Sequence, residues 1–144
     1  MSDVMQADHR LTVETRGKGF VEITSSLRQW LSQIGAEAGL LTVFIRHTSA
    51  SLIIQENADP NVRRDLLDTL EILAPESRDY AHSEEGPDDM PSHIKAMLNE
   101  VSLNIPVREG DMVLGTWQGV YVLEHRTAPH RRQLALNFLG RCQD

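Results

Sequence analysis

Four short apolar segments with brief connections fill the C-terminal third of the chain, and this spacing constrains the fold most. They are SLNIPV (102–107), MVLGTW (112–117), VYVLEH (120–125) and RQLALNFLG (132–140). Their aliphatic and β-branched residues are typical of strands. The connections are too short for a crossover helix, so they predict antiparallel neighbours in a sheet.

The N-terminal half adds four more predicted strands. RLTVETRGKGFVEIT (10–24) alternates apolar and polar residues on either side of a glycine-containing turn, which predicts two strands. LLTVFIRH (40–47) and ASLIIQE (50–56) are short, β-branched and apolar. Both are therefore predicted to be buried strands.

The first predicted helix is SSLRQWLSQIGAEAG (25–39), where apolar residues change to helical spacing. Ser26 and Gln29 form a capping-box pattern at its start. Gly39 is suited to end the helix.

Two further helices are predicted around a central acidic loop. ADPNVRRDLLDTLEILAP (58–75) begins with Asp59 as the cap and Pro60 in the first helical position, where a missing N–H costs nothing. The apolar stripe of this helix comprises Val62, Leu66, Leu70 and Leu73. The third helix is predicted to start near Pro91 and to continue to Val101.

Eight strands and three helices predict an α+β fold with a two-layer, antiparallel, β-sandwich-like core. The 144 residues correspond to one domain, residues 1–144, that is long enough to bury a core.

Composition narrows the class of protein. The formal net charge of −7 argues against a nucleic-acid partner, which needs clustered basic residues. The single cysteine, Cys142, excludes an intrachain disulfide and suits a reducing compartment. The N-terminus lacks the apolar core of a signal peptide, and no stretch approaches the length of a membrane span. A soluble cytoplasmic protein is expected, without a membrane partner.

The loop AHSEEGPDDMPSHI (81–94) concentrates titratable side chains. His82 and His93 bracket four carboxylates on a segment stiffened by two prolines. Asp88 and Asp89 precede the third helix, where a carboxylate can cap free N–H groups. The remaining carboxylates could bind Mg²⁺, orient a ligating histidine or act as a general base.

Four of the six histidines lie at the ends of predicted elements, and they are candidates for a metal site. Three neutral imidazoles with an open position make a catalytic zinc site. His82, His93 and His125 are the predicted ligands, and His47 is the next candidate. No HExxH or CxxC spacing supports this set, so an ordinary hydrogen-bonding role near the surface is the alternative. His9 and His130 are expected to be surface residues.

Hydroxyl groups follow the strand that ends at His47. Thr48, Ser49 and Ser51, together with adjacent backbone N–H groups, could hold a phosphate oxygen, but such residues are equally common in turns. No GxSxG motif surrounds a serine, which disfavours a serine hydrolase.

The segment GTWQGVYVLEHR (115–126) also carries candidate residues. Its glycines indicate a tight turn or a close backbone approach beside Gln118. Glu124 and Arg126 point to the same face of a strand and could form an ion pair. Arg126 could instead bind an anionic substrate through two parallel hydrogen bonds. HRR (130–132) is expected to be solvated, or to add a positive edge for phosphate.

Three long segments resemble the YjbQ family, whose small bacterial and archaeal members are often described as secondary thiamine-phosphate synthases. They are HTSASLIIQENADPNVRRDL, EGPDDMPSHIKAML and LGTWQGVYVLEHR. The resemblance covers nearly the whole chain. It implies an α+β fold with a β-sandwich core, a homotrimer and a histidine-rich pocket that binds a divalent metal, zinc or magnesium.

By matching motif positions, the resemblance places four histidines on family histidines: His47, His82, His93 and His125. Asp88 and Asp89 fall on the acidic pair of the family, where other members often have Asp-Asn. We assign the catalytic role to His47, Asp88, Asp89 and Glu124. Substrate binding is assigned to Thr48, Ser49, Ser51, Gln118 and Arg126.

The activity implied by the resemblance joins hydroxymethylpyrimidine diphosphate to thiazole phosphate and releases pyrophosphate, possible as a side activity. The sequence has no glycine-rich phosphate loop, so phosphate contacts would come from residues 47–51, Arg126 and nearby backbone. A metal-dependent hydrolase or lyase of unknown substrate, and a non-enzymatic protein that binds a small phosphorylated metabolite, are the alternatives.

Overall fold

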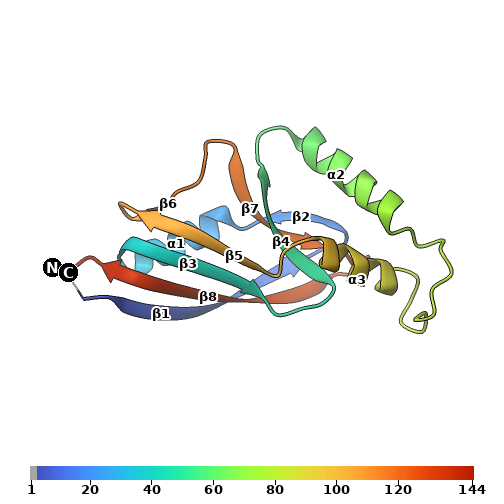
Figure 1. The fold of residues 1–144 in the computed structure, drawn as a ribbon, viewed down its shortest axis with the longest axis horizontal. Coiled ribbons are helices and arrows are strands. Elements are labelled where there is room, and N and C mark those ends of the chain that lie inside the picture. The colour runs from blue at the N-terminus through green and yellow to red at the C-terminus, as the bar shows by residue number, and fades with distance from the viewer. Residues whose placement is uncertain (1–2) are drawn as a thin grey trace.

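The structure is a computed structural model that describes residues 3–144, so the first two residues of the predicted domain lie outside it. The predicted eight strands and three helices are confirmed (Figure 1). They are β1 (Met5–Thr15), β2 (Gly19–Glu22), α1 (Thr24–Gln33), β3 (Ala36–Ile45), β4 (Ala50–Glu56), α2 (Pro60–Leu73), α3 (Asp89–Leu98), β5 (Ser102–Arg108), β6 (Asp111–Met112), β7 (Gln118–Glu124) and β8 (His130–Cys142).

The strands form two antiparallel sheets. One has five strands in the order β1-β8-β3-β5-β6, and the other has three in the order β2-β7-β4. Every strand pair is antiparallel, as the short C-terminal connections predicted. The chain crosses between the sheets several times, because β1 and β8 belong to the larger sheet while β2 and β7 belong to the smaller one.

The apolar core lies between the two sheets. Leu41, Val43 and Leu136 from the larger sheet join Leu52 and Val122 from the smaller sheet in one buried cluster. Helix α1 adds its apolar face to this cluster through Leu27, Trp30 and Leu31. The predicted α+β fold with two antiparallel layers is therefore confirmed.

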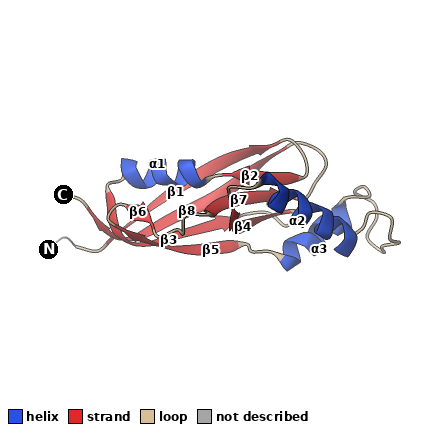
Figure 2. Cartoon of the chain, turned by 90° about the horizontal axis from the view of Figure 1, so that it is seen from above, coloured by secondary structure: helices blue, strands red, loops and turns tan. Residues whose placement is uncertain are grey.

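Helices α2 and α3 gather at one end of the molecule, and the start of β1 and the end of β8 lie at the opposite end (Figures 1 and 2). None of the helices in residues 3–144 is long and apolar enough to cross a membrane. The α2 cap is confirmed, because the backbone N–H of Asn61 donates to the Asp59 side chain behind Pro60.

The first predicted helix is six residues too long. Helix α1 ends at Gln33, and Gly35 reverses the chain with a positive φ of 67°. No side chain caps its start, so the predicted capping box is wrong. Gly39 instead lies inside β3 opposite Gly140, where a Cβ on either residue would come within 2.3 Å of backbone atoms. The glycine therefore serves close strand pairing rather than helix termination.

Other boundaries also differ. Strand β1 begins at Met5, five residues before the predicted start, and β6 is only Asp111–Met112. Helix α3 begins at Asp89 and ends at Leu98, earlier at both ends than predicted.

Candidate functional site

The acidic loop and the first turns of α3 bring three potential ligand atoms together. The Nε2 atom of His82 lies 2.8 Å from Oδ2 of Asp89, and the Nε2 atom of His93 lies 3.4 Å from the same oxygen. Asp89 and His93 share one face of α3 because they are four residues apart. Among residues 3–144 these three side chains form a group whose ligand atoms all lie within 4.8 Å of one another.

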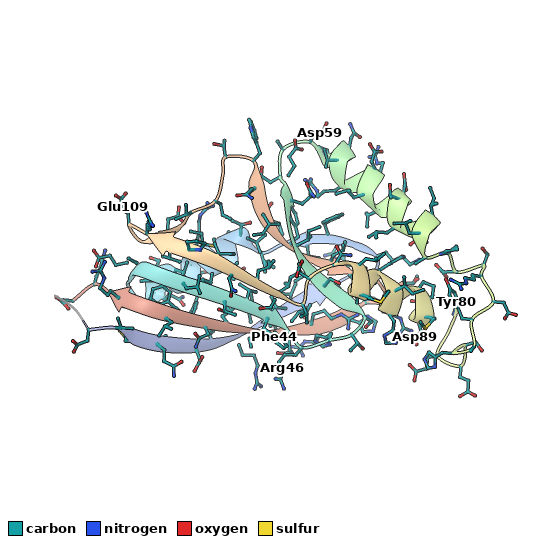
Figure 3. All side chains as sticks on the ribbon, viewed as in Figure 1. Phe44, Arg46, Asp59, Tyr80, Asp89 and Glu109 are labelled. Carbon is teal, nitrogen blue, oxygen red and sulfur yellow. The ribbon has the colours of Figure 1, made fainter. Side chains whose placement is uncertain are left out.

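Arg126, just after β7, fixes the carboxylate of Asp89. Its Nη1 donates to Oδ1 of Asp89 at 2.8 Å, which leaves Oδ2 facing the two histidines. Asp89 is buried, whereas His82 and His93 are partly exposed. Figure 3 shows Asp89 at the beginning of α3, close to the loop that carries Tyr80 and far from Glu109. The carboxylate is thus held in place while the imidazoles face solvent.

The donor set of two imidazoles and one carboxylate oxygen suits a divalent metal with open positions. Such sets hold zinc in hydrolytic enzymes and iron in some oxygenases. Magnesium prefers an all-oxygen, octahedral shell. Of the two predicted metals, zinc therefore fits these residues better.

Asp88 has a structural partner rather than the predicted capping role. No side chain caps α3, and Oδ2 of Asp88 accepts hydrogen bonds from Nε of Arg126 and from the Thr127 backbone N–H. Burial alone would raise the pKa of Asp88, but these hydrogen bonds lower it below its ordinary value. Asp88 stays ionised and anchors Arg126.

The predicted metal ligand His125 lies apart from the His82–Asp89–His93 group. Its Nε2 lies 2.8 Å from Oγ of Ser51, and both residues are almost fully buried. Burial, with Lys95 nearby, lowers the pKa of His125 to about 4, so the imidazole is neutral at pH 7. The structure therefore groups Asp89, and not His125, with His82 and His93.

The predicted catalytic carboxylate Glu124 has no free oxygen. Its two oxygens accept hydrogen bonds from Thr15, from the guanidinium of Arg132 and from the backbone N–H groups of His125 and Arg126. Burial would raise the pKa of Glu124, but Arg132 and Thr15 lower it overall. Such a carboxylate is poorly placed to take a proton, so its role is structural. The predicted Glu124–Arg126 side-chain pair is also wrong, because the partner of Glu124 is Arg132.

His47 keeps a neutral ring. Its Nε2 accepts a hydrogen bond of 2.7 Å from the backbone N–H of Gln133. Burial and the charge of Arg132 lower the pKa of His47. The ring nitrogen that would serve as a base is already engaged.

A cavity of about 330 Å³ adjoins the metal-ligand group, and we call it the α3 pocket. It lies between β4 and α3, and His93 belongs to both the pocket and the ligand group. Its lining residues are His47, Thr48, Ala50, Ser51, His93, Ala96, Met97, Glu100 and Val101. The pocket is thus the cavity in which the predicted Thr48, Ser51 and His47 meet the acidic loop.

Other predicted binding residues have internal partners. The side chain of Gln118 accepts from the backbone N–H of Gly115 and closes a turn. Oγ of Ser49 accepts from Arg132. The guanidinium of Arg126 is engaged by Asp88, by Asp89 and by the carbonyl of Glu85, so its predicted role in binding an anion finds no free donor pair.

Sequence reasoning missed two buried cations. Arg132 was expected to be solvated but is buried against Glu124, and Lys95 is buried against Glu71 of α2. Arg132 lies two and four residues before the buried Leu134 and Leu136 of β8, so all three side chains point to the same face of the strand. Its inward direction could therefore have been found from strand periodicity. Lys95 carries no comparable signal.

Comparison with known proteins agrees with the fold. Residues 9–141 match the family model described as UPF0047 protein YjbQ-like. A UPF0047 protein of Synechocystis is 48% identical over 131 residues, which cover 90% of this chain and 89% of that protein. The YjbQ protein of Salmonella typhimurium is 42% identical over 131 residues, covering 90% and 95%.

Solved structures give the same result. A conserved hypothetical protein from Thermus thermophilus has a TM-score of 0.79 at 35% identity, covering 89% of this chain and 97% of that one. An uncharacterized YjbQ/UPF0047 protein from Clostridium acetobutylicum has a TM-score of 0.80 at 34% identity, covering 92% and 98%. From the model match over residues 9–141 and these relatives, the chain belongs to the YjbQ/UPF0047 family.

Proposed function

We propose that the protein is a metal-dependent enzyme that acts on a small phosphorylated metabolite at the His82–Asp89–His93 group. The observation that carries the proposal is the convergence of two imidazole nitrogens on one fixed carboxylate oxygen. A bound zinc ion would supply Lewis-acid chemistry for a phosphate or another oxygen group.

The residues of the chain have distinct parts in this proposal. His82, Asp89 and His93 hold the metal. Arg126 is a positioning residue, since it reaches the metal only through Asp89, and Asp88 holds Arg126 in turn. The α3 pocket receives the organic part of the substrate.

The specific reaction that we propose is thiamine-phosphate synthesis, either as the main activity of the protein or as a secondary one. It joins hydroxymethylpyrimidine diphosphate to thiazole phosphate, and the new C–N bond forms as the C–O bond to pyrophosphate breaks. Its support is the resemblance of three motifs in the sequence. The relatives named above carry no such activity in their descriptions.

Metal binding tests the first part. Untagged protein should bind about one zinc ion per chain in a competition titration. His82→Ala, Asp89→Asn and His93→Ala should each lower zinc affinity by more than the roughly 10–100-fold typical of losing an outer-shell partner. Arg126→Gln should fall within that range. His9→Ala, which removes an imidazole stacked on Trp30, is the matched control and should bind zinc normally.

Retention of full zinc affinity by all three ligand variants would mean that the group is only a hydrogen-bonded cluster. Turnover is then measured on zinc-loaded protein with the two phosphorylated precursors. Product formation that disappears in Asp89→Asn but not in His9→Ala supports the proposed reaction. Zinc binding without any product would instead favour a metal-dependent enzyme with another substrate, or a non-enzymatic metabolite-binding protein.

We also propose a cytoplasmic homotrimer. The support for the compartment is one free, buried thiol, Cys142, which suits reducing conditions. The support for the assembly is the family resemblance, together with apolar side chains that the single chain leaves exposed.

A further inference from the structure

The α3 pocket has a rigid frame. Backbone hydrogen bonds join Leu52 of β4 to Glu100, which follows α3, in both directions at 2.7 and 3.3 Å. This bridge fixes the end of α3 to the smaller sheet. The pocket between β4 and α3 is therefore a preformed cavity, and its volume of about 330 Å³ lies at the lower end of the range for small-molecule sites.

The charge in the pocket is one-sided. Its lining includes no lysine or arginine, and Glu100 is its one carboxylate. The carboxylate of Glu100 is exposed and has no hydrogen bond or ion pair within residues 3–144. His47 is neutral because burial and Arg132 lower its pKa. A phosphate in the pocket would meet a negative charge and no cation.

Arg46, which precedes His47, is exposed and lines a different cavity, with Asp8 and His9. Three further cations near the α3 pocket are already paired with carboxylates. Arg132 is paired with Glu124, Lys95 with Glu71, and Arg126 with both Asp88 and Asp89. Drawing Arg132 or Arg126 toward a phosphate in the pocket would leave the buried Glu124 or Asp89 without its cation, which is costly. Lys95 is itself buried and held by Glu71. The anionic part of a substrate is therefore excluded from the pocket and directed to the metal end.

The inner wall carries a polar pair that suits an uncharged ligand. Ser51 Oγ lies 2.8 Å from Nε2 of the buried, neutral His125, while Ala50, Ala96 and Val101 supply apolar surface. A neutral imidazole can accept the Ser51 hydroxyl proton or donate its own. Ser51 is only 1% exposed, so the pair lies just behind the pocket surface and adds no net charge to the wall.

Taken together, the geometry points to an α3 pocket that selects an uncharged or cationic organic group, with Glu100 as its charge-selecting residue. This inference rests on the proposed function, because it states where the two ends of the proposed substrate bind. The phosphate lies at His82, Asp89 and His93, and the body extends past His93 along α3. The cavity volume of about 330 Å³ limits the body to about one small ring system.

The test uses three ring compounds of equal size and shape but different charge: benzamidine, benzamide and benzoate. Their binding to metal-free, full-length protein is followed by backbone amide shifts in NMR titrations at pH 7. Benzamidine and benzamide should shift the amides of Ser51 and Ala96, and benzoate should not. Equal or tighter binding of benzoate in the metal-free protein would overturn the inference.

Glu100→Gln gives the sharper comparison, and Glu109→Gln is its matched control. Both remove one exposed glutamate charge, but Glu109 lies in the β5–β6 turn at the other end of the molecule (Figure 3). Glu100→Gln should weaken benzamidine about two- to fivefold, the range of an exposed ion pair, and leave benzamide unchanged. Identical benzamidine affinity in the two variants would show that Glu100 does not select charge.

The outcome is also separable from the proposed function. If the protein binds no zinc but binds benzamidine and benzamide in preference to benzoate, only the proposed metal site is contradicted. If it binds zinc without this preference, only the present inference is contradicted.

Discussion

At the scale of single residues, Glu124 shows how burial separates a structural carboxylate from a catalytic one. Its oxygens accept five hydrogen bonds and face the buried guanidinium of Arg132. Glu124→Gln keeps the shape but leaves Arg132 with an uncompensated charge. We expect the free energy of unfolding to fall by about 3–5 kcal/mol in urea titrations.

The control is Glu14→Gln, because Glu14 is exposed and its oxygen lies 3.9 Å from Arg131. Loss of a surface pair at this distance should change stability by less than about 1 kcal/mol. Two variants with the same unfolding midpoint would contradict the structural role of Glu124.

His125 predicts a pH dependence. Its pKa is about 4 in the folded protein and 6.5 ordinarily, so the unfolded chain binds more protons between these values. Stability should therefore fall as the pH drops from 6.5 toward 4, by about 2 kcal/mol at pH 5 relative to pH 7. His125→Gln should lose much less over this interval in urea titrations at the two pH values. His47 acts in the same direction, since its pKa is also lowered.

The carboxylates Asp88 and Glu124 contribute little to the change in stability between pH 7 and pH 5. Asp88 and Glu124 have lowered pKa values, so the stability that they contribute is lost only as the pH falls below their ordinary values of 3.8 and 4.5. Equal losses in the parent protein and His125→Gln between pH 7 and pH 5 would show that His125 does not titrate as the structure indicates.

The candidate site was predictable in part. The sequence located the acidic loop and the pairing of His82 with His93, because both flank one short segment. It could not show that His125 faces Ser51. Nor could it show that Arg126 pairs with Asp88 and Asp89 while Arg132 pairs with Glu124. Those pairings depend on how β7 and β8 meet residues far away in the chain.

At the scale of elements, α2 is attached mainly by charge. None of its residues is buried, and Glu71 accepts hydrogen bonds from Lys18 of the β1–β2 turn and from the buried Lys95 of α3. Glu71→Gln removes the charge that compensates Lys95. We expect amide hydrogen exchange in α2 to become about tenfold faster or more, equivalent to about 1.4 kcal/mol of local opening.

The matched control is Asp68→Asn, which removes an exposed charge from the same helix without touching a lysine contact. Its exchange rates should match those of the parent protein. If Glu71→Gln also matches the parent, partial apolar burial alone holds α2 in place.

The elements themselves were largely predictable, because strand alternation and helical spacing are local signals. Their ends were less so. Gly39 looked like a helix stop, but its place opposite Gly140 is set by the close approach of β3 and β8. A glycine that ends a helix and one that permits tight strand pairing are identical in sequence.

At the scale of the whole molecule, the single chain leaves two sets of apolar side chains exposed, which we call its two apolar surfaces. The first set, the α2–α3 surface, comprises exposed residues at the C-terminal ends of α2 and α3 and just after α3: Ile72, Leu73, Met97, Leu98 and Val101. The other lies on the larger sheet and includes Leu40, Phe44 and Leu139. The apolar stripe predicted for α2 thus finds no buried environment within residues 3–144. Unlike surfaces on one chain allow head-to-tail contacts, which close into rings such as a trimer.

We therefore expect sedimentation equilibrium at micromolar concentration to give a mass of about 49 kDa, three times the 16.2 kDa of one chain. Ile72→Glu places a charge on the first surface while keeping a helix-favouring residue, so it should shift the protein toward monomer. Trp117→Glu alters an exposed apolar residue in the loop before β7, outside both surfaces, and should leave the mass unchanged. Circular dichroism confirms that both variants are folded. A monomeric parent protein at these concentrations would contradict the trimer, and an unchanged mass for Ile72→Glu would place the interface elsewhere than on the α2–α3 surface.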